Sequence, residues 1–119
     1  MTLTRALCAI CLISALALPA AAEPARIDTR DQFVQTVEGR NLTLFGIRLV
    51  VTPDGVIDGR AFGRDVKGQW QWRDGFFCRD LYWGTRDLGP NCQEVRLNGN
   101  KIRFTSDRGT GQYADLTLR

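Results

Sequence analysis

The sequence predicts a mainly β fold: a small antiparallel meander that closes into a barrel or curls into a half-barrel, with one helix near its start. From Asn41 onward, apolar residues recur with a period of two, which is typical of strands that bury one face. Turn-forming residues interrupt this region at short intervals. A sheet of about seven short strands in so small a domain usually curls, because closure removes its unpaired edges.

Residues 1–22 have the pattern of a cleavable export signal. Arg5 is the only charged residue before a largely apolar run at residues 6–18, and small residues at 20–22 suit a cleavage site after Ala22. The run is shorter than the roughly 20 apolar residues that a membrane span needs. We therefore expect a periplasmic or secreted protein with one β-rich domain, residues 23–119, and no membrane span in the mature chain.

Residues 29–38 are expected to form the helix. Thr29 suits the N-cap position, and Gln32 completes a capping box three residues later. Gly39 suits the C′ position, where a left-handed backbone often ends a helix. The apolar stripe of this helix is Phe33, Val34 and Val37.

The rest of the chain is predicted to alternate between strands and tight turns. Turn signals occur at residues 53–55, 73–75, 98–99 and 107–111. The expected strands cover residues 44–51, 56–61, 64–72, 76–83, 92–97, 101–106 and 112–118. Residues 84–91 are the one longer connection. Short turns between neighbours imply antiparallel hairpins in chain order.

Cys78 and Cys92 are the cysteines that remain after the expected cleavage, which removes Cys8 and Cys11. An even number of cysteines in an exported chain favours a disulfide over a metal site. Closing a loop of about 15 residues stabilises a fold by roughly 3 kcal/mol. The pair does not form a Cys-x-x-Cys motif, so we expect a structural bond.

The sequence leaves open which face of the sheet carries this disulfide. A three-residue loop at 73–75 pairs Trp70 with Cys78 and places the bond on the aromatic face. A two-residue turn at 98–99 instead places Cys92 on the polar face. A β-bulge after Cys92, or a disulfide at the rim of the barrel, would resolve the conflict.

Composition narrows the classes of function. The chain has no histidine, which removes the usual general base, the Ser–His and Cys–His nucleophilic pairs and the commonest metal ligand. The net charge is only +3, and acidic residues are interspersed among the arginines. Nucleic-acid binding needs a concentrated positive face. We therefore expect a non-enzymatic protein with no cofactor, no metal and no nucleic-acid partner.

Paired carboxylates are the catalytic chemistry that remains. Glycosidases need only two acids at a suitable separation. Four acids lie in or near the aromatic segment: Asp74, Asp80, Asp87 and Glu94. Turn or rim positions beside arginines explain each of them equally well.

The segment of residues 68–83 is the most distinctive, because it holds all three tryptophans of the chain. One interpretation is an aromatic surface with polar anchors that binds flat ligands, glycans or partner proteins. Its candidate ligand-binding residues are Trp70, Trp72, Arg79, Asp80, Tyr82 and Trp83. The alternative is that large aromatics, Trp70 and Trp72 above all, pack over the disulfide as the core of a small barrel.

Residues 68–83, 92–100 and 102–111 carry a resemblance to a known group of proteins. In these stretches the chain resembles a family of short exported proteins of alphaproteobacteria, and the resemblance covers nearly all of residues 23–119. It implies a compartment rather than an activity. Members often carry the genome label dihydrodipicolinate reductase, which would imply NAD(P)H-dependent reduction in the cytoplasm. An export signal, no histidine and no Rossmann βαβ unit oppose that label here.

These observations lead to one main expectation of function and two alternatives. We expect a periplasmic β domain that binds a small ligand or an envelope partner through its aromatic strands and residues 84–91. The first alternative is an inhibitor or accessory subunit of an envelope enzyme. The second is an enzyme that uses Asp80 and Glu94.

Overall fold

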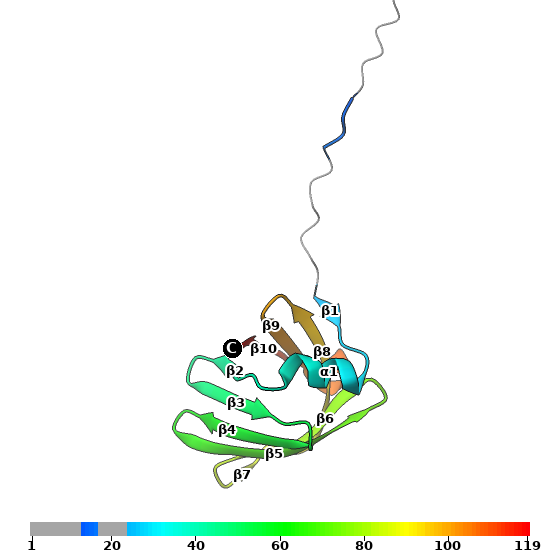
Figure 1. The fold of residues 1–119 in the computed structure, drawn as a ribbon. Coiled ribbons are helices and arrows are strands. Elements are labelled where there is room, and N and C mark those ends of the chain that lie inside the picture. Colours follow the sequence, from blue (N-terminus) through cyan, green and yellow to red (C-terminus); the bar gives the residue numbers. More distant parts are fainter. Residues whose placement is uncertain (1–12, 17–23) are drawn as a thin grey trace, which may run out of the picture.

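The computed structural model describes residues 13–16 and 24–119 of the 119-residue chain. Residues 13–16 have no secondary structure. The rest of the expected export signal, with its cleavage point after Ala22, lies outside the described residues. Residues 24–119 form a closed antiparallel β-barrel with a small share of helix (Figure 1). The predicted fold class is confirmed.

Eight of the ten strands in residues 24–119 close the barrel, and the remaining two extend it. The barrel strands are β2 (Leu42–Leu44), β3 (Ile47–Val51), β4 (Val56–Ala61), β5 (Arg64–Arg73), β6 (Phe76–Trp83), β8 (Asn91–Asn98), β9 (Lys101–Thr105) and β10 (Tyr113–Leu118). The extra strands are β1 (Ala25–Arg26), beside β8, and β7 (Arg86–Asp87), beside β6. The helix is α1 (Arg30–Val37), and a short turn segment is α2 (Ser106–Gly109). No helix among the described residues is long and apolar enough to cross a membrane.

The expected strand at residues 44–51 is two strands instead of one. Leu44 pairs with Ile47, so Phe45 and Gly46 form a tight turn between β2 and β3. Gly46 has a φ of 73°, a left-handed conformation that glycine adopts without steric cost. The connection at residues 84–91 similarly contains a strand, β7. Both differences raise the strand count above the seven expected.

The barrel closes where β6 meets β8. The ladder there has three residue pairs, with Cys78 opposite Cys92 in the middle. The two cysteines form the predicted disulfide, and their Cα atoms lie 3.9 Å apart. Because β8 then turns away to pair with β1, the bond covalently fixes a short seam of the barrel.

The disulfide faces outward. Asp74 and Gly75 form a two-residue turn in which both residues have positive φ, so Gln71 lies opposite Cys78, where a three-residue loop would place Trp70. The expected loop was therefore wrong by one residue, and such a slip exchanges the two faces of a strand. Neither a bulge nor a rim position is needed.

The second hairpin keeps its predicted faces although its turn moves. The turn is formed by Gly99 and Asn100, one residue later than expected, so Val95 pairs with Phe104 instead of Ile102. A shift of two positions on the partner strand preserves the direction of every side chain. The polar face predicted for β8 is correct.

The core fills the barrel around Phe33 of α1, which covers one opening of the barrel (Figure 1). The predicted N-cap and capping box are present at Thr29 and Gln32. They set the helix so that Phe33 is fully buried, with ring centroids 5.1 Å from Trp70 and 4.9 Å from Phe77. The interior is thus packed by side chains from the helix and from facing strands.

Candidate functional site

Trp70 belongs to the core, and Trp72 packs against the core while only partly buried. Trp70 is 4% exposed, and its indole Nε1 donates to the Thr52 carbonyl at 2.9 Å. The Trp72 Nε1 donates to the Asp28 carbonyl at 3.1 Å. Both rings contact Phe33. A buried tryptophan with a packing role needs apolar contacts for its ring and a hydrogen-bond partner for its indole N–H, and both residues have these.

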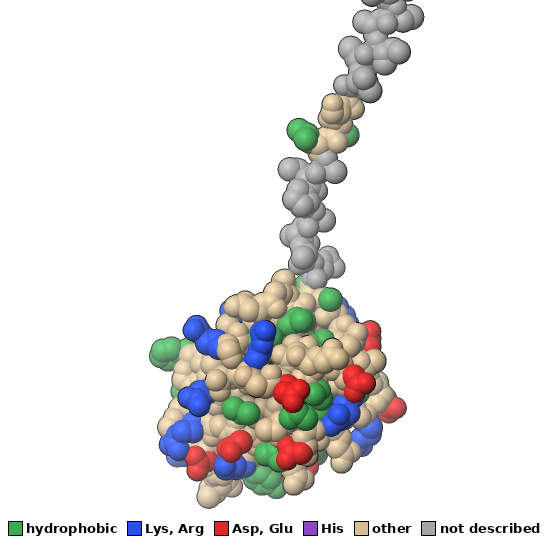
Figure 2. Space-filling view, viewed as in Figure 1, with side chains coloured by type: hydrophobic (Ala, Val, Ile, Leu, Met, Phe, Trp, Pro, Cys, Tyr) green, Lys and Arg blue, Asp and Glu red, His purple; other side chains and the backbone are tan. Residues whose placement is uncertain are grey.

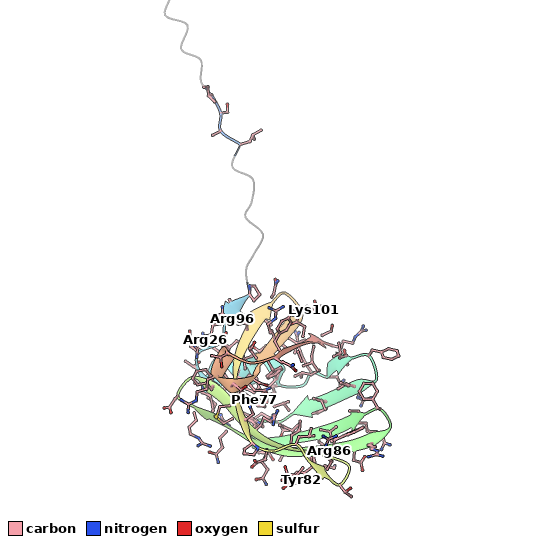
Figure 3. All side chains as sticks on the ribbon, turned by 180° about the vertical axis from the view of Figure 1, so that it is seen from behind. Arg26, Phe77, Tyr82, Arg86, Arg96 and Lys101 are labelled. Carbon is pink, nitrogen blue, oxygen red and sulfur yellow. A yellow bond between two sulfur atoms is a disulfide. The ribbon has the colours of Figure 1, made fainter. Side chains whose placement is uncertain are left out.

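Trp83 and Tyr82 lie near the other end of β6. The Trp83 Nε1 donates to the Ala61 carbonyl at 2.7 Å, and the Arg64 guanidinium lies over its ring at 4.9 Å. Tyr82 faces the opposite side of the strand and is 45% exposed. Figure 3 shows Tyr82 at this end with Arg86 of β7, away from Phe77 in the interior. The four aromatic candidates are therefore not gathered on one surface.

Arg79 is a half-buried cation on the inward face of β6, opposite Trp70 in the ladder. Its Nη1 donates to the Gly89 carbonyl at 2.9 Å. Burial lowers the pKa of the guanidinium, and the charge of Asp80 opposes that shift. Arginine stays protonated in proteins, so the site keeps a positive charge that water only partly solvates.

An open groove of about 890 Å³ lies between the β3–β4 turn and α2. It crosses the outer face of β5, β6 and the start of β8. The side chains that face outward from β5 and β6 there are Gln69, Gln71, Arg73 and Asp80. The residues at its sides include Asp54, Asn91, Asp107 and Arg108. We call this space the outer groove.

Three of the six candidate residues border the outer groove. Asp80 faces into it, whereas the side chains of Trp70 and Arg79 lie on the inward face of their strands. Glu94 does not line the groove, and its carboxylate pairs with Arg96, Oε1 to Nε, at 2.5 Å. The structure therefore does not bring Asp80 and Glu94 together in the groove. Across residues 13–16 and 24–119, no three His, Cys, Asp or Glu side chains gather closely enough to hold a metal ion.

Segment α2 holds two groove residues in a strained conformation. Asp107 (φ 56°, ψ 47°) and Arg108 (φ 53°, ψ 38°) are left-handed, and Gly109 follows at φ 90°. A left-handed backbone costs a non-glycine residue about 1–2 kcal/mol. Asn91 holds the turn, since its amide donates to Asp107 Oδ1 and accepts from the Asp107 N–H, both at 2.9 Å. Strain of this kind concentrates at functional sites.

Five polar side chains of the outer groove are available to a ligand. Among the described residues, no protein group hydrogen-bonds to the side chains of Gln69, Gln71, Arg73, Asp80 or Arg108. The Arg108 guanidinium lies over the Phe76 ring at 5.5 Å, which positions it without occupying its N–H groups. The groove thus offers guanidinium and amide donors beside carboxylate and amide acceptors.

Most of these groove residues were missed from the sequence. Gln69, Gln71 and Arg73 alternate with the tryptophans, so their period of two marks one solvent-facing side of β5. The sequence alone could have identified this polar face. It could not have identified Asp107 and Arg108 as groove residues, because their place depends on a fold that brings α2 beside β8.

Comparison of the chain with protein-family models, curated proteins and solved structures gives no match. The resemblance to the exported family stays a prediction. Function therefore has to be inferred from the outer groove itself.

Proposed function

We propose that this protein is a non-enzymatic binding domain whose outer groove holds a polar ligand with both hydroxyl and carboxylate groups, the chemistry of an acidic sugar. The observation that carries the proposal is the groove of about 890 Å³, whose lining includes the unengaged side chains of Gln69, Gln71, Arg73, Asp80 and Arg108. Ligand sites commonly occupy about 300–1,000 Å³. A space of this size accommodates a short oligosaccharide.

The arrangement of donors and acceptors supports this ligand class. Gln69 and Asp80 are directly opposed on β5 and β6, so an amide and a carboxylate lie together on the groove floor. Sugar hydroxyls both donate and accept, and this pair offers both partners. Arg73 and Arg108 supply guanidinium groups, which bind carboxylates through paired hydrogen bonds.

The aromatic strands have a supporting role in this proposal. The core contacts of Trp70 and Trp72 hold β5 in place, so the alternate residues of that strand are presented on a rigid surface. A preformed site loses less conformational entropy on binding. The disulfide that lines the groove and the export pattern of the sequence support binding outside the cytoplasm.

Calorimetry with a glucuronic-acid-containing disaccharide tests the proposal, with cellobiose as the neutral comparison. We expect the acidic sugar to bind more tightly. Arg108→Ala and Asp80→Asn should each weaken it roughly tenfold, the cost of about one charge-assisted hydrogen bond.

Arg86→Ala is the matched control, because Arg86 is an exposed arginine that does not line the groove. Equal affinity for both sugars, or equal losses in the control and in Arg108→Ala, would contradict the proposal. Stable copurification with a single envelope protein, lost in Arg108→Ala, would instead support the accessory-subunit alternative.

A further inference from the structure

A second surface feature lies apart from the outer groove, at the tips of two hairpins. Leu44, Phe45 and Phe62, here called the hairpin patch, are 47%, 92% and 64% exposed. The β2–β3 and β4–β5 turns that carry them lie side by side (Figure 1). Their contact is direct, because the Phe62 N–H donates to the Gly46 carbonyl at 2.8 Å. The tips therefore present their aromatic rings on one protruding surface.

Phe62 is a poor residue for the position that it occupies. Its φ of 50° is left-handed, and the first position of such a turn favours Asn, Asp or Gly. A bulky side chain with positive φ is an outlier that costs about 1–2 kcal/mol. Because the ring is also mostly exposed, burial in the barrel does not compensate for this cost. Phe62 therefore lowers the stability of its turn, and contact of its exposed ring with an external partner explains the residue better than folding does.

Arginines flank the hairpin patch. Arg48 and Arg60 are directly opposed on β3 and β4, a like-charge pair that disfavours the isolated sheet. Arg64 follows on β5. Asp65 offsets one of these charges through its 2.8 Å contact with Arg60. Figure 2 shows apolar side chains projecting at the left edge of the molecule with basic side chains beside them.

We propose that the hairpin patch docks the protein on an anionic lipid bilayer, with Phe45 and Phe62 inserted at the level of the headgroups and Arg48, Arg60 and Arg64 against the lipid phosphates. Apolar side chains beside a basic surface are the features that hold interfacial proteins on membranes. Each arginine near an anionic surface adds to the attraction.

The shape of the patch favours a bilayer over a protein partner. A stable protein interface buries about 800 Å² on each partner, and two narrow turns offer little flat area for that. A lipid headgroup layer deforms around projecting rings and needs no complementary pocket. The bilayer also supplies negative charge to Arg48, whereas Asp65 already pairs with Arg60.

Site-specific fluorescence quenching tests the proposal. Phe45→Trp places a reporter on the patch, and vesicles of phosphatidylcholine with phosphatidylglycerol carry a nitroxide-labelled lipid. We expect quenching of the added tryptophan on anionic vesicles, and little on phosphatidylcholine alone. Val56→Trp is the positional control, because it lies at the opposite end of β4, roughly 20 Å away, and should not be quenched. The N-terminal segment is the same in every variant, so its contribution cancels.

Two further variants report on binding itself. Phe45→Ser with Phe62→Ser should weaken vesicle binding roughly tenfold through lost apolar insertion. Arg48→Gln should reduce both the affinity and its salt dependence. The single Phe45→Ser variant serves if the double variant does not fold.

Three results would overturn the proposal. The first is an introduced tryptophan in the Phe45→Trp variant that anionic vesicles leave unquenched. The second is vesicle binding that the serine and glutamine variants leave unchanged. The third is concentration-dependent dimerisation that Phe45→Ser abolishes, because it would assign the patch to a second copy of the chain.

Discussion

Arg108 combines backbone strain with a position in the outer groove. Its φ of 53° disfavours any side chain, while its guanidinium lines the groove. A residue retained for folding alone would be glycine at such a position. Arg108 therefore fits a role in binding that opposes stability.

Comparing Arg108→Gly with Arg108→Ala separates these two roles. Both variants lose the guanidinium, so both should lose affinity for the acidic disaccharide. Only glycine relieves the strain, so the glycine variant should be more stable than the alanine variant by about 1 kcal/mol. Urea denaturation followed by tryptophan fluorescence measures the difference. An alanine variant as stable as the glycine variant would contradict the left-handed assignment.

The Arg103–Asp115 pair makes stability depend on pH. Arg103 donates through Nε and Nη2 to the two carboxylate oxygens at 2.7 and 2.9 Å. These hydrogen bonds lower the pKa of Asp115 below its ordinary value of 3.8. A carboxyl with a lowered folded-state pKa stabilises the fold above the unfolded pKa, and this contribution disappears as the pH falls through the folded value.

Asp115→Asn should therefore unfold more easily than the parent at neutral pH, and the two should converge as the pH falls below 3.8 and through the lowered pKa of Asp115. Urea midpoints between about pH 7 and pH 2 measure this convergence. Because both side chains are still partly exposed to water, at 34% and 38%, the difference at neutral pH should be small. A gap that stays constant down to the lowest pH would show that the lost contact is not electrostatic.

At the scale of elements, the disulfide controls the seam between β6 and β8. The bond lies in the middle of a ladder of three pairs, and both cysteines line the outer groove. Cys78→Ser with Cys92→Ser should lower the free energy of unfolding by about 3 kcal/mol, since the two residues are 14 apart in the chain.

Hydrogen exchange locates that loss. Amides at residues 77–79 and 91–93 should exchange faster in the double variant, while those between β3 and β4 should change less. Disaccharide affinity should fall with the seam, because the groove crosses it. Uniformly faster exchange across all strands would mean that the bond stabilises the whole fold and does not act on the seam.

The elements that the sequence predicted well have strong local signals. Thr29 and Gln32 define the helix start by contacts within one turn, and the turn residues separate most strands. The register of the 73–75 turn failed because Asp74 adopts a positive φ of 52°, which makes a two-residue turn possible. That single residue decides whether Cys78 shares the strand face of Trp70 or that of Gln71, and with it the floor of the groove.

At the scale of the whole molecule, the core and the outer groove lie on opposite faces of the same strands. Trp70 packs on Phe33 while its neighbours Gln69 and Gln71 face the groove. The alternation along β5 was predictable, whereas the approach of α2 and of the β3–β4 turn depends on closure of the barrel. The sequence could therefore predict the polar strand face that forms the floor of the groove, but not the segments that border it.

The interior of the barrel is packed by α1. Phe33 is fully buried and its ring lies within 6.3 Å of Trp70, Trp72, Phe77 and Phe104, centroid to centroid. Phe33→Ala would leave a cavity among these rings, and such a truncation costs about 3–5 kcal/mol. That is a large share of the roughly 5–15 kcal/mol that stabilises a domain.

We therefore expect Phe33→Ala to unfold at a much lower urea concentration than the parent, with an unchanged dependence on urea. Val34→Ala is the control, because Val34 is on the same helix but only partly buried, and it should cost less than half as much. If Phe33→Ala were no more destabilising than Val34→Ala, the helix would be an appendage of the barrel. The strands would then have to close and hold the groove without it.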